Sequence, residues 1–293
     1  MSKDFVVSEI VENVPVAVNA YRLRLACPNL AAAFQPGQFV MIRIAGVKDP
    51  LLGRPLAVYN IWRNEQGAPA GVDVIYVAVG KGTQLFSEMR PGQSMEIWGP
   101  LGNGFPAVQD VDHLILLSGG VGQTPMFTVA QEALGLVQFA NRKPQPPKRV
   151  SLCYGARDKD TFAGLSDFAD LKARSAIPFD IYLTTDDGSL VPGFRYRKGF
   201  AVNPMEELFQ SGAENQEKAM VFACGPRPML IAAQKLFNQY KIPGKVSLES
   251  PMACGLGICF SCVAKILSPE GTWDYKRTCK EGPVFDADKV VWD

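Results

Sequence analysis

Near its C-terminus the chain contains Cys254-Gly-Leu-Gly-Ile-Cys259-Phe-Ser-Cys262, and a fourth cysteine, Cys279, follows after sixteen intervening residues. The spacing C-x₄-C-x₂-C…C is typical of the thiolates that bind a [2Fe–2S] cluster. A loop that wraps a two-iron cluster has to present three thiolates from one tight turn and a fourth from a distant strand. The two glycines inside the loop let the backbone curl close to the cluster and point N–H groups at its sulfides. The four cysteines are therefore candidate cluster ligands.

A zinc site is the alternative for these cysteines. Zinc ligands usually come as two closely spaced pairs, whereas the first three cysteines here form one run, so we favour the iron–sulfur cluster. The chain has a single histidine, His113, which argues against His-based zinc catalysis and against triad chemistry. Cys27 and Cys153 are scattered in the sequence and are expected to be core residues.

The composition indicates a folded, soluble protein. Hydrophobic residues make up 47% of the chain and the formal net charge is +1, so disorder, nucleic-acid binding and attraction to an anionic membrane are not expected. No run of about 18 apolar residues occurs, so membrane insertion is not expected either. The N-terminal segment lacks the apolar stretch of a signal peptide. Because its cysteines also favour metal over disulfide use, we expect a cytoplasmic protein.

Residues 1–108 are expected to form an antiparallel β-barrel domain. Strand-like segments begin at Tyr21, Gln38, Val72 and Ser94, and turns rich in Gly and Pro separate them. Short strands at this spacing, with few helical patterns between them, are typical of a small barrel.

Residues 109–244 are expected to form a doubly wound parallel sheet with helices. The apolar segment 113–117 ends in a glycine-rich turn and is followed by a helical pattern. Further strands are predicted over 149–154, 179–183 and 219–223, and a helix from Pro228. Strand and helix in alternation indicate an α/β domain. The Pro-rich stretch 142–148 is expected to be a surface connection within that domain.

Residues 245–293 are predicted to form a third, small domain around the cysteines. The segment is too short and too rich in glycine to hold a large apolar core alone. A bound metal cluster would supply the stability that such a core does not.

Two segments of the predicted barrel supply the groups that a pyrophosphate needs. One is Arg54-Pro55-Leu56-Ala57, and the other, about 25 residues later, is Gly80-Lys81-Gly82-Thr83. A guanidinium and the N–H groups of a Gly-Thr turn give paired donors and room for close approach. Each segment alone is weak evidence, because Arg-Pro is common in surface turns and Gly-Lys-Gly in hairpins. Next to a nucleotide domain and a cluster, they predict a flavin site.

A nicotinamide dinucleotide is expected at the carboxyl edge of the predicted parallel sheet. The turn between the first strand and its helix has the sequence Ser118-Gly119-Gly120-Val121-Gly122-Gln123-Thr124-Pro125. It is not the strict G-x-G-x-x-G fingerprint, but its glycines let a diphosphate approach the helix N-terminus. A plain tight turn is the alternative.

Two more segments follow predicted strands at the same edge. Asp186 and Asp187 are candidates for contact with the ribose or the nicotinamide. Cys224 and Gly225 precede a helix and are candidates for the contact between nicotinamide and flavin, so Cys224 is the candidate catalytic residue. The alternative is that Cys224 is a small buried hydrophobe.

Taken together, these motifs resemble the ferredoxin–NADP reductase superfamily. More narrowly, the chain resembles the family of iron–sulfur electron-transfer subunits of NAD-dependent dihydroorotate dehydrogenases, in order and over essentially its whole length. The most specific parts are Gly99-Pro-Leu-Gly-Asn-Gly-Phe105 and the cysteine-rich tail up to Phe285. By matching motif, the resemblance implies cluster binding by the four cysteines and FAD binding by Arg54, Pro55, Leu56, Ala57, Ile75, Tyr76, Val77, Gly82 and Thr83.

The resemblance also implies a partner. In the family, the subunit forms a hetero-oligomer with a catalytic subunit that carries FMN and oxidises dihydroorotate, a step of pyrimidine biosynthesis. Two features depart from the family. Ala57 stands where Ser or Thr is frequent, and extra length is found around 139–149 and 190–201, where we expect surface loops.

The predicted function is electron transfer between NAD(H), FAD and the [2Fe–2S] cluster, and from there to a partner redox subunit. Hydride passes between nicotinamide and flavin without a side-chain acid or base. We favour NAD over NADP, because the acids of 154–160 offset Arg157 and Lys159. Glu249, between the nucleotide domain and the cysteines, is expected near the flavin. The alternative function is an NAD(P)H-linked reductase subunit of another redox complex, with ferredoxin, a sulfur compound or a hydrogenase as acceptor.

Overall fold

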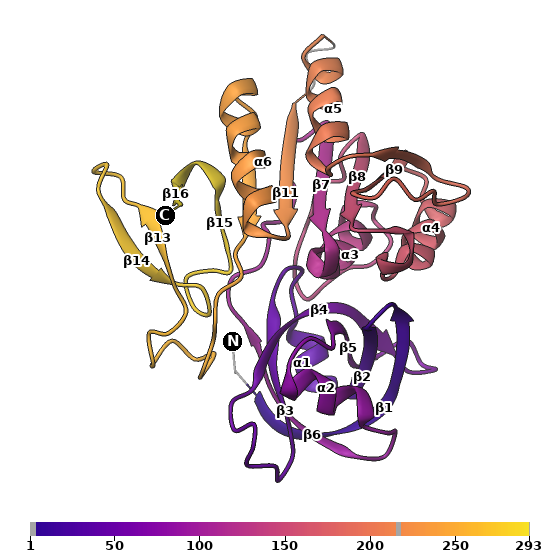
Figure 1. Cartoon of the computed structure of the whole chain (residues 1–293), viewed down its shortest axis with the longest axis vertical. Helices are drawn as coiled ribbons and strands as arrows, with labels where there is room; N and C mark the ends of the chain where they lie inside the picture. The colour runs from indigo at the N-terminus through magenta and orange to yellow at the C-terminus, as the bar shows by residue number, and fades with distance from the viewer. Residues whose placement is uncertain (1–3, 215–217, 293) are drawn as a thin grey trace.

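The computed structural model describes residues 4–214 and 218–292. Figure 1 shows a barrel built from the N-terminal third of the chain, an α/β domain above it, and the C-terminal segment beside both. The predicted fold class is confirmed. No helix in the described part of the chain is both long enough and apolar enough to cross a membrane.

Six antiparallel strands close the barrel in the order β1-β2-β5-β4-β3-β6. Along β2 the side chains of Leu23 and Leu25 are buried inside, while the alternating Arg22 and Arg24 are half-buried on the other face, as a period of two requires. Two short helices, α1 (Pro28–Ala33) and α2 (Lys81–Glu88), cover the barrel ends. The strands are β1 (Asp4–Ala17), β2 (Ala20–Ala26), β3 (Phe39–Ile44), β4 (Arg54–Arg63), β5 (Pro69–Val77) and β6 (Ser94–Leu101).

The α/β domain contains a seven-stranded sheet in the order β10-β9-β8-β7-β11-β12-β15. All neighbours are parallel except β12 and β15, which pair antiparallel. Its strands are β7 (His113–Gly119), β8 (Arg149–Ala156), β9 (Phe179–Thr185), β10 (Arg195–Lys198), β11 (Ala219–Cys224), β12 (Gly244–Ser247) and β15 (Val284–Asp286). Its helices are α3 (Gln123–Ala133), α4 (Leu165–Arg174), α5 (Val202–Glu214) and α6 (Arg227–Tyr240).

The C-terminal segment forms a three-stranded sheet in the order β14-β13-β16, made of β13 (Val263–Leu267), β14 (Trp273–Arg277) and β16 (Val290–Val291). Ile266 and Val290 from this sheet join the same apolar cluster as Leu230 and Phe237 of α6. The segment also donates β15 to the large sheet. The core of the small domain is therefore completed by apolar side chains of the α/β domain. The proposed domain boundaries are 1–108, 109–244 and 245–293.

The two segments of extra length are not simple surface loops. Phe139 is buried in the barrel core, edge-on to Phe34 at 5.8 Å between ring centroids. The Arg142 guanidinium pairs with the buried Glu132 and donates to the carbonyl of Phe105. The stretch 142–148, predicted as a surface connection within the α/β domain, and the preceding Phe139 therefore link that domain to the barrel. In the other segment, residues 195–198 extend the sheet as β10, which the sequence analysis had missed.

Candidate functional site

The four tail cysteines lie in two pairs. Cys254 and Cys259 contact each other on the outer side, where Cys259 is exposed. Cys262 and Cys279 contact each other and are almost fully buried, with exposed fractions of 1% and 0%. Hydrogen bonds from Ser261 lower the pKa of the Cys259 thiol to about 6, whereas burial raises the pKa of Cys279 to about 12. The two halves of the site therefore have different environments.

This arrangement suits a two-iron cluster better than a single ion. A zinc ion needs four ligands around one point, whereas a rhombic [2Fe–2S] cluster takes two thiolates on each iron. The loop between the cysteines turns at Gly255 and Gly257, whose φ angles of 68° and 82° favour glycine.

The barrel forms the inner wall of the cysteine site. Phe39 and Met41 of β3, together with Leu101, pack in one apolar cluster with Cys262 and Cys279. The contact is close, because a Cβ atom at Gly255 would lie 2.5 Å from the Met41 Cγ atom. On the same side, the Trp98 indole N–H donates to the carbonyl of Cys254 at 3.0 Å. A cluster bound here would have β3 and β6 of the barrel as its neighbours.

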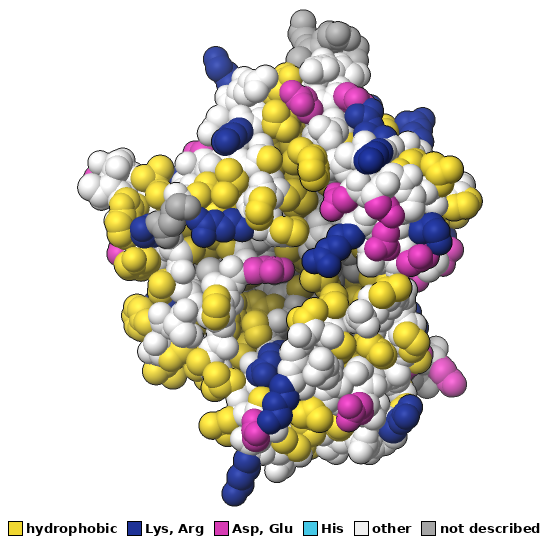
Figure 2. All heavy atoms as spheres, in the orientation of Figure 1, with side chains coloured by type: hydrophobic (Ala, Val, Ile, Leu, Met, Phe, Trp, Pro, Cys, Tyr) yellow, Lys and Arg dark blue, Asp and Glu magenta, His cyan; other side chains and the backbone are white. Residues whose placement is uncertain are grey.

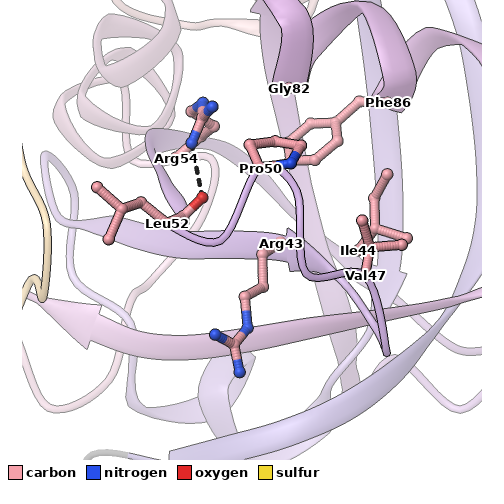
Figure 3. Close-up of a pocket in the computed structure, with 8 residues that line it drawn as sticks. All are labelled: Arg43, Ile44, Val47, Pro50, Leu52, Arg54, Gly82 and Phe86. Atoms are coloured by element: carbon pink, nitrogen blue, oxygen red, sulfur yellow. Dashed lines mark hydrogen bonds between the residues drawn. The ribbon is translucent and has the colours of Figure 1, made fainter.

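Arg54 stands at the start of β4 against the first turn of α2. Its Nη1 donates to the carbonyl of Leu52 at 2.6 Å, and its guanidinium would lie 2.7 Å from a Cβ atom at Gly82. A side chain at position 82 would make this guanidinium shift. Figure 3 shows both residues at a small pocket that Pro50 and Phe86 also line. The structure thus brings together the two segments that the sequence analysis proposed for the pyrophosphate.

The Gly82-Thr83 segment is a helix N-terminus and not the turn that we expected. Gly80 is the N-cap of α2, and the Thr83 hydroxyl accepts hydrogen bonds from the N–H groups of Val79 and Gly80. The first N–H groups of a helix have no partner within it and carry a partial positive charge. A helix start beside an arginine suits a pyrophosphate better than a turn does.

The remaining predicted flavin residues lie on β4 and β5. Pro55, Leu56 and Ala57 are all half-buried at the start of β4. On β5, Ile75 and Tyr76 are buried in protein cores, and the Tyr76 hydroxyl donates to the Asn13 side chain. The Tyr76 ring is therefore committed to the barrel interior. Contact between this strand and a flavin would come from its backbone or from Val77, which is half-buried.

At the carboxyl edge of the sheet, the glycine turn meets the Cys224-Gly225 segment. A Cβ atom at Gly122 would lie 2.3 Å from the carbonyl oxygen of Cys224, and one at Gly119 would lie 2.8 Å from the Pro226 ring. Gly119 ends β7, while Gly120–Gly122 form a single 3-10 turn before α3. Close packing explains Gly119 and Gly122, whereas Gly120 has a φ of 54° and open space where a Cβ would be, so a ligand can approach the turn there.

Polar groups are buried without partners at this edge. Within the described residues, Ser118 Oγ, both ends of the Gln123 amide and Thr184 Oγ1 lack hydrogen bonds. They flank the carboxyl ends of β7 and β9 and the start of α3. Unsatisfied polar atoms are rare in folded proteins and fit a place where a polar ligand or water completes the site. Thr124 and Pro125 of α3 are buried, and the Thr124 hydroxyl donates to the Val121 carbonyl.

Asp186 and Asp187 follow β9, beside the end of β8. The Asp187 carboxylate accepts two hydrogen bonds from Ser189, which lower its pKa, and both aspartates are exposed. The strand β8 lies between β9, which these acids follow, and β7, which the glycine turn follows, so one strand separates the acids from the turn. This position suits a ribose more than the nicotinamide ring.

Cys224 ends β11 next to β7, with 5% of its surface exposed. Burial raises the pKa of its thiol to about 12, with a contribution from the nearby Glu249, so it stays protonated at neutral pH. Burial likewise raises the pKa of Glu249, which lines a groove with Gly225 and Ser250. Figure 2 shows a hollow near the middle of this face of the molecule. A neutral thiol can pack against a ring but is a poor acid or base.

Sequence reasoning missed two residues of the cysteine site. Trp98 has no motif that links it to the tail, and only the folded barrel places it there. Ser261 stands inside the quoted cysteine stretch, so its closeness to the ligands was visible, but its hydrogen bond to Cys259 at 3.2 Å depends on how the loop turns.

Three family models match consecutive parts of the chain. The oxidoreductase FAD-binding domain matches residues 6–105, the oxidoreductase NAD-binding domain 116–235, and the iron-sulfur cluster binding domain of dihydroorotate dehydrogenase B 249–291. The fold is similar to that of an NADH-dependent reduced ferredoxin-NADP oxidoreductase, with a TM-score of 0.77, 24% identity, and coverage of 98% of this chain and 90% of the other. The chain is therefore an oxidoreductase with FAD-binding, NAD-binding and iron–sulfur domains.

Curated relatives match over nearly the whole chain. The electron transfer subunit of dihydroorotate dehydrogenase B (NAD(+)) from Desulforamulus reducens is 35% identical over 95% of both chains. The subunit of the same name from a Geobacillus species is 33% identical over 96% of both. The chain belongs to the family of dihydroorotate dehydrogenase B electron transfer subunits, which confirms the resemblance seen in its motifs and the predicted set of FAD, NAD and iron–sulfur cofactors.

Proposed function

We propose that this chain takes a hydride from NADH onto FAD and passes the electrons singly, through a [2Fe–2S] cluster, to a catalytic subunit of a dihydroorotate dehydrogenase, or runs the same path in reverse. The names of its relatives support this proposal. The observation that carries it is the position of the barrel. Its β3 strand packs on the buried pair of tail cysteines, and its β4 strand packs on α3 of the NAD-binding domain through Tyr59 and Phe127.

The chain's own residues bind and orient in this scheme. FAD, when bound, accepts two electrons as a hydride and can release them one at a time. We assign its pyrophosphate to Arg54 and the N–H groups that start α2, and the dinucleotide diphosphate to the turn 119–122. Asp186 and Asp187 are assigned to the ribose. Cys224, as a neutral thiol, is assigned to packing against the nicotinamide, which needs no proton from the protein.

The exit of electrons is assigned to the cluster loop, residues 254–262. Leu256, Ile258 and Phe260 on this loop have exposed fractions of 40%, 76% and 59%. Three exposed apolar side chains around a redox site are unusual for a free surface and suit a protein partner. We infer that the FMN-containing catalytic subunit of a hetero-oligomer covers this loop. A cytoplasmic location remains part of the proposal.

The test is the visible spectrum of the anaerobically purified holoprotein before and after one addition of NADH. Flavin bands with a broad iron–sulfur shoulder should both bleach, and NADPH at the same concentration should act much more slowly. A protein that stays colourless after reconstitution with FAD, iron and sulfide contradicts the proposal. If only NADPH bleaches the bands, the NAD assignment is wrong and the electron path stands.

The partner is tested separately by co-expression with a catalytic subunit. The complex should reduce NAD⁺ with dihydroorotate, and the double variant Ile258→Asp, Phe260→Asp should lose the complex while keeping both cofactors. If the catalytic subunit does not bind the unmodified chain, the acceptor is of another kind, such as ferredoxin, a sulfur compound or a hydrogenase.

A further inference from the structure

The two pairs of tail cysteines differ in how many hydrogen bonds reach their sulfur atoms. On the outer pair, the Leu256 N–H donates to Cys254 Sγ at 3.3 Å, and Cys259 receives hydrogen bonds from both the backbone and the hydroxyl of Ser261. On the inner pair, Cys279 receives a backbone hydrogen bond from Gly257, apolar side chains of the barrel pack on both cysteines, and the Arg277 guanidinium lies close enough to interact with their charge. Hydrogen bonds therefore compensate negative charge on the outer pair, whereas a nearby cation contributes on the inner pair.

Within the described residues, Ser261 is the only residue other than the cysteines themselves whose side chain hydrogen-bonds to one of these four sulfurs. Its hydroxyl oxygen accepts a hydrogen bond from the Ala253 N–H at 3.2 Å and lies 3.2 Å from Cys259 Sγ. Because an iron-bound thiolate has no proton to give, the serine must be the donor in the holoprotein. The Ala253 N–H fixes the oxygen and leaves the hydroxyl proton for the sulfur.

We propose that Ser261 is a positioning residue that raises the reduction potential of the cluster through Cys259, the exposed cysteine of the loop. Hydrogen bonds to cluster sulfurs are one of the means by which a protein sets this potential. The step concerned adds one electron, of the two that NADH supplies as a hydride, to one ferric iron, which becomes ferrous. No bond forms or breaks, and the extra negative charge is spread onto the thiolates.

The position of Ser261 gives the effect a direction. Cys259 is exposed on the cluster loop between Ile258 and Phe260, whereas Cys262 and Cys279 are buried against the barrel. A hydrogen-bond donor at Cys259 stabilises the added electron on the side of the cluster from which it passes to the acceptor. This inference rests on the proposed function, since it requires a cluster at these cysteines.

The experiment is an anaerobic redox titration of the holoprotein, followed by the EPR signal of the reduced cluster. In Ser261→Ala we expect the equilibrium constant for reduction of the cluster to fall by about threefold to tenfold. A tenfold fall equals a shift of the midpoint potential by about 59 mV to more negative values for one electron. Ser261→Thr keeps a hydroxyl and should restore most of the potential. The control is Ser268→Ala, whose hydroxyl contacts Thr272 in the β13–β14 turn, away from the cysteines.

Iron content and the optical spectrum are measured for each variant, so that loss of the cluster is not mistaken for a shift. A Ser261→Ala protein with a full cluster and an unchanged midpoint potential overturns the inference. The same result follows if Ser261→Thr behaves like Ser261→Ala, because a loop distortion would then explain the shift. A chain that forms no cluster in its unmodified form instead contradicts the proposed function.

Discussion

The barrel meets its two neighbours through interfaces of different kinds. Toward the α/β domain the contacts are large buried side chains: Tyr59 stacks on Phe127 at 4.5 Å between ring centroids, Phe105 stacks on Phe222 at 4.8 Å, and Phe139 enters the barrel core. Toward the tail the contacts are a small apolar cluster around Cys262 and Cys279 and hydrogen bonds to backbone carbonyls. The Asn103 N–H donates to the carbonyl of Gly282, and the Trp98 indole N–H donates to that of Cys254.

The difference indicates what each interface depends on. Buried aromatic rings give the barrel and the α/β domain a fixed relation that needs no cofactor, which suits hydride transfer between two bound rings. The tail has a thin apolar layer at the barrel and two cysteine pairs that face each other. Its attachment should therefore depend on a bound cluster, as in other small metal-dependent domains. The following predictions are designed to separate the two interfaces.

The largest expected effect is that of Cys279→Ser, which removes one buried ligand. We expect loss of the cluster, because the inner pair is enclosed and leaves no space for a replacement ligand. Hydrogen exchange should then rise over 250–285, while the barrel and α/β domain keep their protection and FAD. Cys153→Ser, which changes a buried cysteine of the large sheet, is the control and should keep the cluster. Equal loosening of all three domains would contradict the proposed dependence.

Phe139→Ala should give the next largest effect, at the other interface. Removal of a buried phenyl ring costs about 3–5 kcal/mol of unfolding free energy, because it leaves a cavity in the barrel core. Urea unfolding should show this loss, and the cluster content should stay unchanged. Phe200→Ala in the other extra segment is the matched control, since Phe200 is 66% exposed. If Phe139→Ala lowers the unfolding free energy no more than Phe200→Ala does, the segment that begins at Phe139 does not link the two domains.

Local patterns in the sequence were sufficient for the domain order and for the cysteine site. The barrel strands alternate with a period of two, and the strand over 113–117 is a buried apolar run, so both were predictable from neighbouring residues. The role of Phe139 was not. It begins the segment of extra length 139–149, which was expected to be a surface loop, and only the folded barrel offers a cavity for its ring.

The same limit applies to the candidate sites. Spacing was enough to choose the four cysteines, because ligand geometry is set by a short loop. The sequence indicated that Arg54 and Gly82 bind the same ligand, but it did not show that the guanidinium packs directly on Gly82, since the two residues are far apart in sequence. The helix at Gly82-Thr83 was also missed, because two glycines near a threonine favour a turn on local propensity alone. What decides there is the packing of α2 on the barrel.

Gly255→Ala should have a moderate effect at the tail interface. At a φ of 68° an added Cβ costs about 1–2 kcal/mol, and this Cβ would also press on Met41 and Leu101. We expect a cluster that is lost faster to chelators at unchanged FAD content. Gly271→Ala separates the two causes, because its φ is 82° but no atom lies within 4 Å of the added Cβ. If both variants lose the cluster at the same rate, backbone strain alone accounts for the effect.

The smallest expected effect is that of Tyr59→Phe, which keeps the stacked ring and removes one hydrogen bond to Asp167 at 2.7 Å. We expect a loss of about 1–2 kcal/mol, since the acceptor is a carboxylate. Burial, and then the charge of Asp167, raise the pKa of the Tyr59 hydroxyl well above 10. A phenol that ionises only in the unfolded state contributes stability that is complete below pH 10 and is lost as the pH rises further. The unfolding free energy of Tyr59→Phe should therefore fall less steeply above pH 10 than that of the unmodified chain. An equally steep fall in both proteins would show that Tyr59 is free to ionise at this interface.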